Sequence, residues 1–308
     1  MSRIAFVGLG TMGAPIARHL VGAGHEVVGF DVQRARVDEL GLVSAASAAE
    51  AVTRADAAFT SLPALEDVRE VWLGAEGLAA GARPGTLLVD LSTGSPALAR
   101  ELAETLEPRG LDVLDAPVSG GPHGAEEGAL TVMVGGREEA YERARPLLEA
   151  FGRHVVRIGG HGAGQTAKLC NNLVAGVTMA GLAEACAIAE HEGVDATTLF
   201  EVLAASTGDS RVLRVRFPLS GVDPRHPSSR DWQPLFALDL IAKDLGLVVE
   251  LAETAGVEAG VTQAALAEYG ASQAAGHGRH DYSAVFLRIR EGAARVASAR
   301  ASSATPTK

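Results

Sequence analysis

The sequence is short of the features that mark disulfide-rich, zinc-binding and nucleic-acid-binding proteins. Its 308 residues include two cysteines, Cys170 and Cys186, whose number and spacing fit neither a disulfide framework nor a zinc site, and no metal site is predicted. Acidic side chains outnumber basic ones by 38 to 27, giving a formal net charge of -11, which argues against nucleic acid as a partner. Because cysteine is scarce and no disulfide framework is indicated, a reducing compartment is expected.

The N-terminus leaves no room for a secretory signal, because the first predicted strand starts at Arg3. The cytoplasm is therefore the expected location. The stretch 169–189 is long enough to span a membrane, but Asn171, Asn172 and Glu184 interrupt it and no basic cluster follows. A helix buried between domains or subunits is the favoured interpretation, and no membrane partner is expected.

The first half of the chain alternates short apolar runs with amphipathic helical patterns. The apolar runs predict strands at 4–7, 26–30, 57–60, 86–90, 111–114, 130–134 and 155–158. Helix starts are predicted at Ser47 and at Ser95, where Pro96 takes the first helical position. This alternation predicts a Rossmann-type doubly wound α/β sheet, mostly parallel, over residues 1–163.

Beyond Gly164 the strand signals stop and helical patterns take over. Helices are predicted at about 166–192, 195–205 after a cap at Asp195, 234–255 and 260–275. The stretch 219–233 carries prolines, a glycine and charges and is predicted to be irregular. Because 308 residues exceed one typical core, an all-α substrate and oligomerisation domain is expected at 164–293, followed by a disordered tail at 294–308.

A glycine-rich turn follows the first predicted strand. In "RIAFVGLGTMGAPIARHL", Gly8, Gly10 and Gly13 have GxGxxG spacing between a strand and a helix. Glycines there permit a tight turn and close backbone approach to a pyrophosphate, while the helix N-terminus presents N–H groups to the anion. The second strand ends at Asp31, where an acceptor for a ribose hydroxyl is expected. The pattern predicts dinucleotide binding, against the alternative of a glycine turn beside a surface aspartate.

Asp31 also bears on the choice of nicotinamide cofactor. A carboxylate repels a 2'-phosphate and accepts a hydrogen bond from a free hydroxyl, so NAD is preferred over NADP. Arg34 and Arg36 lie nearby and could soften that preference, although arginines on a following helix are more often solvated surface charges.

A second glycine-rich stretch, "DAPVSGGPHGAEEGALTVMVGG", covers residues 115–136. Successive backbone N–H groups in such a loop can form a concave anion site, and Ser119 adds a hydroxyl donor. A small carboxylate substrate would suit Ser119, Gly120 and Gly121. Taken alone, the stretch is equally compatible with a flexible loop between strands.

Lys168 and Asn172 begin the long apolar stretch. On a helix these residues stand one turn apart on the same face, while Asn171 is predicted to point elsewhere. The pair could hold one hydroxyl or carbonyl oxygen, with the lysine exchanging the proton and the amide fixing the oxygen. The alternative is that Lys168 extends to solvent and Asn172 caps a neighbouring element.

The segment "FALDLIAKDLGLVVELAE" offers another lysine with carboxylates nearby. Asp239 and Lys243 stand one turn apart, and Asp244 follows directly. A lysine with a carboxylate partner could close the nicotinamide end of the site. A surface ion pair between residues one turn apart is the ordinary explanation.

Together these motifs resemble the β-hydroxyacid dehydrogenases. The segments "GLGTMGAPIARHL", "SLP", "DLSTGSP", "DAPVSGGPHGAEEGALTVMVGG", "GAGQTAKLCNN" and "AKDLGL" occur in that family's order and spacing, to about Arg290. Within the family, the proline-rich stretch 217–245 and "DYSAVF" look like those of 3-hydroxyisobutyrate dehydrogenases. Two positions depart from the pattern: Ser61 stands where methionine is usual and Asp67 where asparagine is common. The stretch 206–214 is also unusually basic for that subfamily.

The resemblance implies roles for individual residues. Lys168 would be the catalytic acid/base, Asn172 would orient the substrate, and Ser119, Gly120 and Gly121 would hold its carboxylate. The expected contacts to the dinucleotide, including Asp244 as a support for the nicotinamide end, come from Gly8, Leu9, Gly10, Thr11, Met12, Gly13, Asp31, Leu62, Pro63, Asp67, Thr93, Lys243 and Asp244.

The implied activity is NAD-dependent oxidation of a short 3-hydroxy acid, namely 3-hydroxyisobutyrate to methylmalonate semialdehyde in valine degradation, within branched-chain amino acid catabolism. A lysine with an ordinary pKa of about 10.4 is protonated at neutral pH, so reduction should run well there and oxidation should favour alkaline pH. Reduction of tartronate or succinic semialdehyde remains an alternative, as does a non-catalytic dinucleotide-binding module. With the substrate bound between the two halves, the apolar helix at 166–192 would bridge them. This helix is apolar around more of its circumference than one small domain needs, which predicts a homodimer or homotetramer built on helical contacts.

Overall fold

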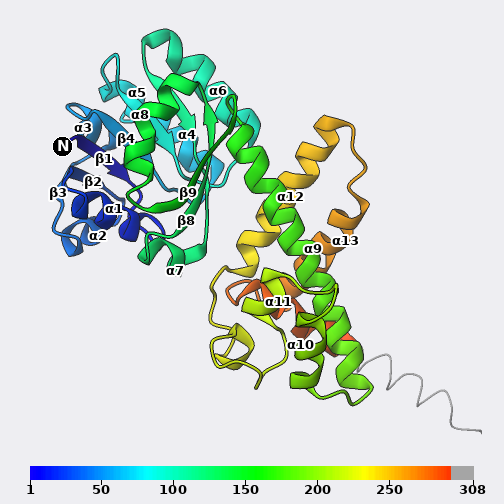
Figure 1. Cartoon of the computed structure of the whole chain (residues 1–308). Helices are drawn as coiled ribbons and strands as arrows, with labels where there is room; N and C mark the ends of the chain where they lie inside the picture. Colours follow the sequence, from blue (N-terminus) through cyan, green and yellow to red (C-terminus); the bar gives the residue numbers. More distant parts are fainter. Residues whose placement is uncertain (293–308) are drawn as a thin grey trace, which may run out of the picture. The chain divides into compact units, whose positions relative to one another are not determined.

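The computed structural model describes residues 1–292 of the chain. Contacts divide the chain into two compact units, one covering Met1–Leu169 and the other beginning at Cys170. The predicted disordered tail at 294–308 lies outside the described residues. The two units, whose helices and strands are labelled in Figure 1, are called the sheet unit and the helical unit below.

The sheet unit contains one nine-stranded sheet. Its strands are β1 (Arg3–Val7), β2 (Glu26–Phe30), β3 (Val43–Ser44), β4 (Ala57–Thr60), β5 (Leu87–Asp90), β6 (Asp112–Asp115), β7 (Val118–Ser119), β8 (Leu130–Gly136) and β9 (Gly152–Gly159). All seven predicted strands are present within a few residues. The two-residue strands β3 and β7 were not predicted, because so short a run shows no periodicity.

The strand order is β3-β2-β1-β4-β5-β6-β8-β7, with β9 paired to β8. Strands β1 to β6 pair in parallel, whereas β8 runs antiparallel to β6 and β7. Chain order reverses between β1 and β4, which is the crevice where doubly wound sheets bind nucleotides. The predicted fold class, a mostly parallel Rossmann-type sheet followed by helices, is confirmed.

Helices cover both faces of this sheet (Figure 1). They are α1 (Gly13–Gly22), α2 (Arg34–Glu39), α3 (Ala48–Val52), α4 (Leu65–Leu73), α5 (Leu78–Gly81), α6 (Pro96–Leu106), η1 (Glu107–Arg109), α7 (Gly121–Glu126) and α8 (Glu138–Leu148). Alternate residues of β1 point to opposite faces: Ile4 and Phe6 pack with α1, α2, α7 and α8, and Ala5 and Val7 pack with α3 to α6. Two apolar cores therefore hold the sheet between helical layers.

The predicted helix starts in the sheet unit are also confirmed. The Ser47 side chain accepts a hydrogen bond from the backbone N–H of Glu50, and Ser95 accepts one from Leu98 with Pro96 next to it. Each serine satisfies an N–H group that the helix itself leaves unpaired.

The helical unit is built on the long helix α9 (Ala163–His191), whose residues up to Leu169 belong to the sheet unit. It continues with α10 (Ala196–Ala204), α11 (Arg211–Arg216), η2 (Pro227–Ser229), α12 (Leu238–Ala255), α13 (Gly260–Ala274), η3 (Tyr282–Ala284) and a helical run at 285–292. The predicted cap at Asp195 is confirmed, since it accepts from the Thr198 N–H. Helix α11 and the run at 285–292 were not predicted.

The helical unit has one apolar core and no strand within the described residues, where a single bridge joins Ala237 to Asp281. By length and composition, α9 is apolar enough to cross a membrane, with a mean hydropathy of 1.5, but long core helices of other proteins meet the same criterion. Parts of α9 contribute to that core, including Met179, Ala183 and Cys186.

Candidate active site

The glycine turn after β1 is tightly packed at two of its three glycines. A Cβ on Gly8, whose φ is +88°, would lie 2.3 Å from the Ser61 carbonyl oxygen, and one on Gly13 would lie 1.9 Å from the Gly8 oxygen. At Gly10 a Cβ would meet only an Arg36 nitrogen, 3.7 Å away. The turn therefore has no room for a side chain at Gly8 or Gly13, whereas Gly10 has more space around it.

Helix α1 starts directly after this turn, and its N-cap, Met12, makes no side-chain hydrogen bond to the helix. Thr11 is exposed and Met12 is half-buried. Backbone N–H groups at such a start suit a pyrophosphate, so the turn fits the expected dinucleotide.

Asp31 follows β2 and is held beside the glycine turn. Its Oδ2 accepts a hydrogen bond from the Leu9 N–H at 2.8 Å, and its Oδ1 accepts one from the Gln33 N–H at 2.8 Å. An Arg36 nitrogen lies 3.4 Å from Oδ2. The carboxylate is thus fixed at the end of β2, where an acceptor for a ribose hydroxyl was predicted.

Two further loops leave the same edge of the sheet, because β4 and β5 run parallel to β1 beside it. Leu62, after β4, donates its backbone N–H to the Ser92 hydroxyl oxygen at 2.9 Å, which joins this loop to the one that carries Thr93. Pro63 and Asp67 are exposed, with Asp67 in the first turn of α4. The predicted contacts Leu62, Pro63 and Thr93 therefore lie in adjacent loops.

The second glycine-rich stretch contains a short strand, a turn and a helix. Ser119 ends β7 and pairs with Thr131 of β8, and α7 starts two residues later. Gly120 and Gly121 have φ values of +142° and +66°, conformations that other residues rarely adopt. Gly120 and Gly121 therefore form the turn between β7 and α7.

Lys168 lies on the first part of α9 and is buried, with 7% of its surface exposed. The start of α9 is fixed by Asp115, whose Oδ1 accepts the Gly162 N–H at 2.8 Å and whose Oδ2 accepts the Gln165 N–H at 2.9 Å. Burial raises the pKa of Asp115, while these two hydrogen bonds oppose the rise. The alternative in which Lys168 extends into solvent does not match this burial.

Asn172 lies one turn after Lys168 on α9 and is 5% exposed. Its Nδ2 donates to Asp244 Oδ2 of α12 at 2.7 Å, and its Oδ1 accepts from Asn171 Nδ2 at 3.0 Å. Asn171 is exposed, as expected for a residue off the face that carries Lys168 and Asn172, although its amide still reaches the Asn172 oxygen. Lys243 lies 3.2 Å from the other Asp244 oxygen.

Asp244 was predicted to support the nicotinamide end of the site, and it is the residue that fixes the Asn172 amide. Asp239 accepts a hydrogen bond from Gln273 at 2.7 Å. No local pattern links Asn172 to Asp244, because the two lie on different helices far apart in sequence.

Two buried residues of this region were not singled out from the sequence. Asp90, the register partner of Asp115, accepts hydrogen bonds from the Thr60 hydroxyl and the Ser92 N–H. Burial raises the pKa of Asp90 to about 6, against the lowering effect of those two hydrogen bonds. Gln165 is 1% exposed and joins α9 to the loop after β5. Both lie within quoted motifs, "DLSTGSP" and "GAGQTAKLCNN", which was the available signal.

Comparison with known proteins places the chain among dehydrogenases. Residues 3–160 match the family described as the NAD binding domain of 6-phosphogluconate dehydrogenase. Residues 162–289 match the family described as NAD-binding of NADP-dependent 3-hydroxyisobutyrate dehydrogenase.

Individual relatives are similar along nearly the whole chain. An NAD-dependent L-serine dehydrogenase of Pseudomonas aeruginosa is 43% identical over 288 residues, covering 92% of this chain and 97% of that protein. A 3-hydroxyisobutyrate dehydrogenase of the same organism is 44% identical over 272 residues, covering 87% of this chain and 90% of that protein. The solved structure of a Mycobacterium tuberculosis 3-hydroxyisobutyrate dehydrogenase with L-serine matches with a TM-score of 0.88 at 41% identity, covering 94% of this chain and 99% of that one.

Proposed function

Because the chain belongs to the 3-hydroxyisobutyrate dehydrogenase family of NAD-dependent dehydrogenases, we propose that it oxidises 3-hydroxyisobutyrate to methylmalonate semialdehyde. NAD, when bound, supplies the acceptor for the hydride that leaves the alcohol carbon. The chain's own residues then have to hold the substrate and take the hydroxyl proton. Valine degradation is the pathway in which this step would serve.

The observation that carries the proposal is the placement of Lys168 and Asn172. Both are buried, both lie on one face of α9, and the helix start before them is fixed by Asp115. In oxidation Lys168 takes the proton from the substrate hydroxyl, and in reduction it returns a proton to the same oxygen. Asn172, fixed by Asp244, holds that oxygen in place.

The two glycine-rich segments have separate tasks in this proposal. Ser119, Gly120 and Gly121 bind the substrate carboxylate. Asp31 binds the adenosine ribose, and the turn Gly8–Gly13 binds the pyrophosphate. The remaining cofactor contacts are proposed at Leu62, Pro63, Asp67, Thr93, Lys243 and Asp244.

L-serine is a second candidate substrate. It is also a 3-hydroxy acid, with an amino group where 3-hydroxyisobutyrate has a methyl group. Two relatives favour it: the protein at 43% identity is named an L-serine dehydrogenase, and the matching Mycobacterium tuberculosis structure was solved with L-serine. An enzyme that uses L-serine must tolerate or bind an ammonium group, whereas burial of a methyl group favours 3-hydroxyisobutyrate.

Steady-state kinetics of the purified protein separate these candidates. The panel contains (S)-3-hydroxyisobutyrate and L-serine, each assayed with NAD⁺ and with NADP⁺. It also contains tartronate and succinic semialdehydes, each assayed with NADH and with NADPH. We expect the highest kcat/KM for 3-hydroxyisobutyrate with NAD, since one methyl group in an apolar site is worth roughly 10- to 200-fold. A higher value for L-serine would reassign the substrate, and turnover of no panel member would favour a non-catalytic binding module.

We also propose a cytoplasmic homo-oligomer that uses the helical unit. Val174 and Ile188, two large apolar side chains on α9, are 62% and 65% exposed, and a partner subunit packed on this helix would cover them. Sedimentation at several concentrations tests this proposal, and Val174→Glu should shift the chain towards monomer. A monomer at all concentrations would contradict it.

A further inference from the structure

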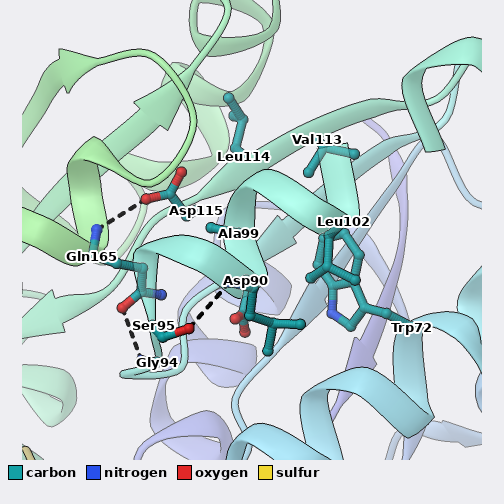
Figure 2. Close-up of a pocket in the computed structure, with 11 residues that line it drawn as sticks. Trp72, Asp90, Gly94, Ser95, Ala99, Leu102, Val113, Leu114, Asp115 and Gln165 are labelled. Carbon is teal, nitrogen blue, oxygen red and sulfur yellow. Dashed lines mark hydrogen bonds between the residues drawn. The ribbon is translucent and has the colours of Figure 1, made fainter. Parts of the chain in front are cut away.

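Gln165 is a buried amide that makes two hydrogen bonds to one short loop. Its Oε1 accepts from the Gly94 N–H at 2.8 Å, and its Nε2 donates to the Ser92 carbonyl oxygen at 2.8 Å. Figure 2 shows this side chain reaching from α9 to Gly94. The two bonds grip the loop on either side of Thr93, so the loop cannot shift without breaking at least one of them.

The Ser92–Gly94 loop also makes hydrogen bonds to neighbouring segments. The Ser92 hydroxyl oxygen accepts the Leu62 N–H at 2.9 Å, and the Ser92 N–H donates to Asp90 at 3.0 Å. Both loops that are proposed to contact the dinucleotide, after β4 and after β5, are therefore connected to the amide of Gln165.

The backbone at Gln165 is also held by close contacts. Its N–H donates to Asp115 at 2.9 Å, and a Cβ on the preceding Gly164 would lie 2.3 Å from the Met133 oxygen. The first turn of α9 thus sits directly on the edge of the sheet. Lys168 follows three residues later, one helical turn along.

We propose that Gln165 is a positioning residue that sets the Ser92–Gly94 loop and the Lys168 turn in one fixed frame. It does not touch the reacting atoms. Its role is to keep the dinucleotide loop and the acid/base at a constant separation, which matters because hydride and proton must leave the same alcohol group. The inference rests on the proposed roles of Lys168 and Thr93.

Gln165→Met is the direct test. Methionine has nearly the same length but makes neither hydrogen bond, and its flexible chain can adapt to the small cavity of about 10 Å³ beside Gln165, which Asp90, Ser95 and Asp115 help to line (Figure 2). Thr166→Val is the matched control. It removes the hydrogen bond from the Thr166 hydroxyl to the Gly162 oxygen in the same helical turn and leaves the loop untouched.

For Gln165→Met we expect kcat to fall about 10- to 100-fold, since small displacements of reacting groups have effects of that size. NADH affinity, from fluorescence titration, should weaken by less than about fivefold, and the primary deuterium isotope effect on kcat should increase. Thr166→Val should keep kcat within about twofold. A Gln165→Met enzyme with unchanged kcat, or one that loses only cofactor affinity, would overturn the proposal.

Gln165→Glu adds a readout that simple destabilisation would not move. A protonated glutamic acid can accept from Gly94 and donate to Ser92, as the amide does, whereas the carboxylate cannot donate. Burial raises the pKa of a carboxyl group, so the ratio of mutant to wild-type kcat should rise about threefold or more as pH falls from about 8 to about 6. A flat ratio would overturn the proposal.

Lys168→Met, measured in parallel, distinguishes a failure of the proposed function from a failure of the positioning role of Gln165. If that variant turns over normally, the proposed function fails. If it is inactive while Gln165→Met behaves as wild type, the acid/base assignment stands and the positioning role alone fails.

Discussion

The sheet unit and the helical unit hold their candidate residues in different ways. In the sheet unit, Asp31, Asp90 and Asp115 each accept at least two hydrogen bonds that fix the loops at the strand ends. In the helical unit, Asn172 depends on one carboxylate, Asp244. Loss of the Asp115 contacts should therefore reduce mainly the stability of the protein, whereas loss of the Asn172 contact should reduce mainly its activity.

The largest effect is expected at Asn172 in the helical unit. Asn172→Ala should lower kcat/KM about 100-fold, because the substrate oxygen loses its guide, while NADH affinity stays within about threefold. Asp244→Asn keeps an oxygen that can accept from Asn172, so its loss should be smaller. Steady-state kinetics with fluorescence titration of NADH measure both variants. Equal losses for the two would contradict the larger role given to Asn172.

The start of α9 provides the corresponding test in the sheet unit. Asp115→Ala leaves the Gly162 and Gln165 N–H groups buried without an acceptor, so the free energy of unfolding should fall by about 3 kcal/mol. Urea unfolding measures this change. Asp112→Ala on the same strand, which removes ion pairs to Arg137 and Arg143 nearer the surface, should cost about 1 kcal/mol. Equal costs would show that Asp115 has no special anchoring role.

Asp90 predicts how stability depends on pH. Its pKa is raised from 3.8 to about 6 in the folded chain, so between these values the folded state binds more protons than the unfolded state. Its contribution to stability is therefore present below about pH 4 and lost as pH rises through 6, by up to about 3 kcal/mol. Unfolding of Asp90→Asn should lack this slope and keep the slope of the same sign that the raised pKa of Asp115 provides.

The helical unit offers a control of opposite sign. Hydrogen bonds from Thr198 lower the pKa of Asp195 at the start of α10, so its contribution is lost as pH falls. Asp195→Asn should therefore remove a slope in the other direction. Parallel pH profiles for Asp90→Asn and Asp195→Asn would contradict both assignments.

The smallest effects concern helix caps, where the two units should not differ. Ser95 caps α6 in the sheet unit and Ser210 caps α11 in the helical unit, each through one hydrogen bond to a backbone N–H. Replacing either by alanine should reduce the free energy of unfolding by about 1 kcal/mol. Chemical unfolding of both variants checks this, and a difference above about 1 kcal/mol would mean that the two caps are not equivalent.

The sequence predicted the sheet better than its connections. Apolar runs located the long strands because most of them are buried on one or both faces, with β9 as a largely exposed exception. The motifs led correctly to the dehydrogenase family and to NAD. The predicted placements of Asp31 and of the two glycine turns rest on local spacing, which a sequence displays directly.

Contacts between distant segments left no such pattern. Gln165 meets Gly94, and Asn172 meets Asp244, only after the chain has folded, and a buried glutamine looks like any other in a helix. Strand pairs as short as β3 and β7 were missed for a related reason, because two residues cannot show a period. The substrate's side chain depends on such unpatterned contacts too, which is why the choice between 3-hydroxyisobutyrate and L-serine needs kinetics.

Single-turnover hydride transfer in Lys168→Met, followed by NADH absorbance, tests the central claim most directly. Cys170→Ala, an exposed position on the same helix, is the control. The account predicts that Lys168→Met binds NADH as the wild type does but transfers hydride about 10²- to 10⁴-fold more slowly, as expected for loss of an acid/base group. Transfer at the wild-type rate would contradict it.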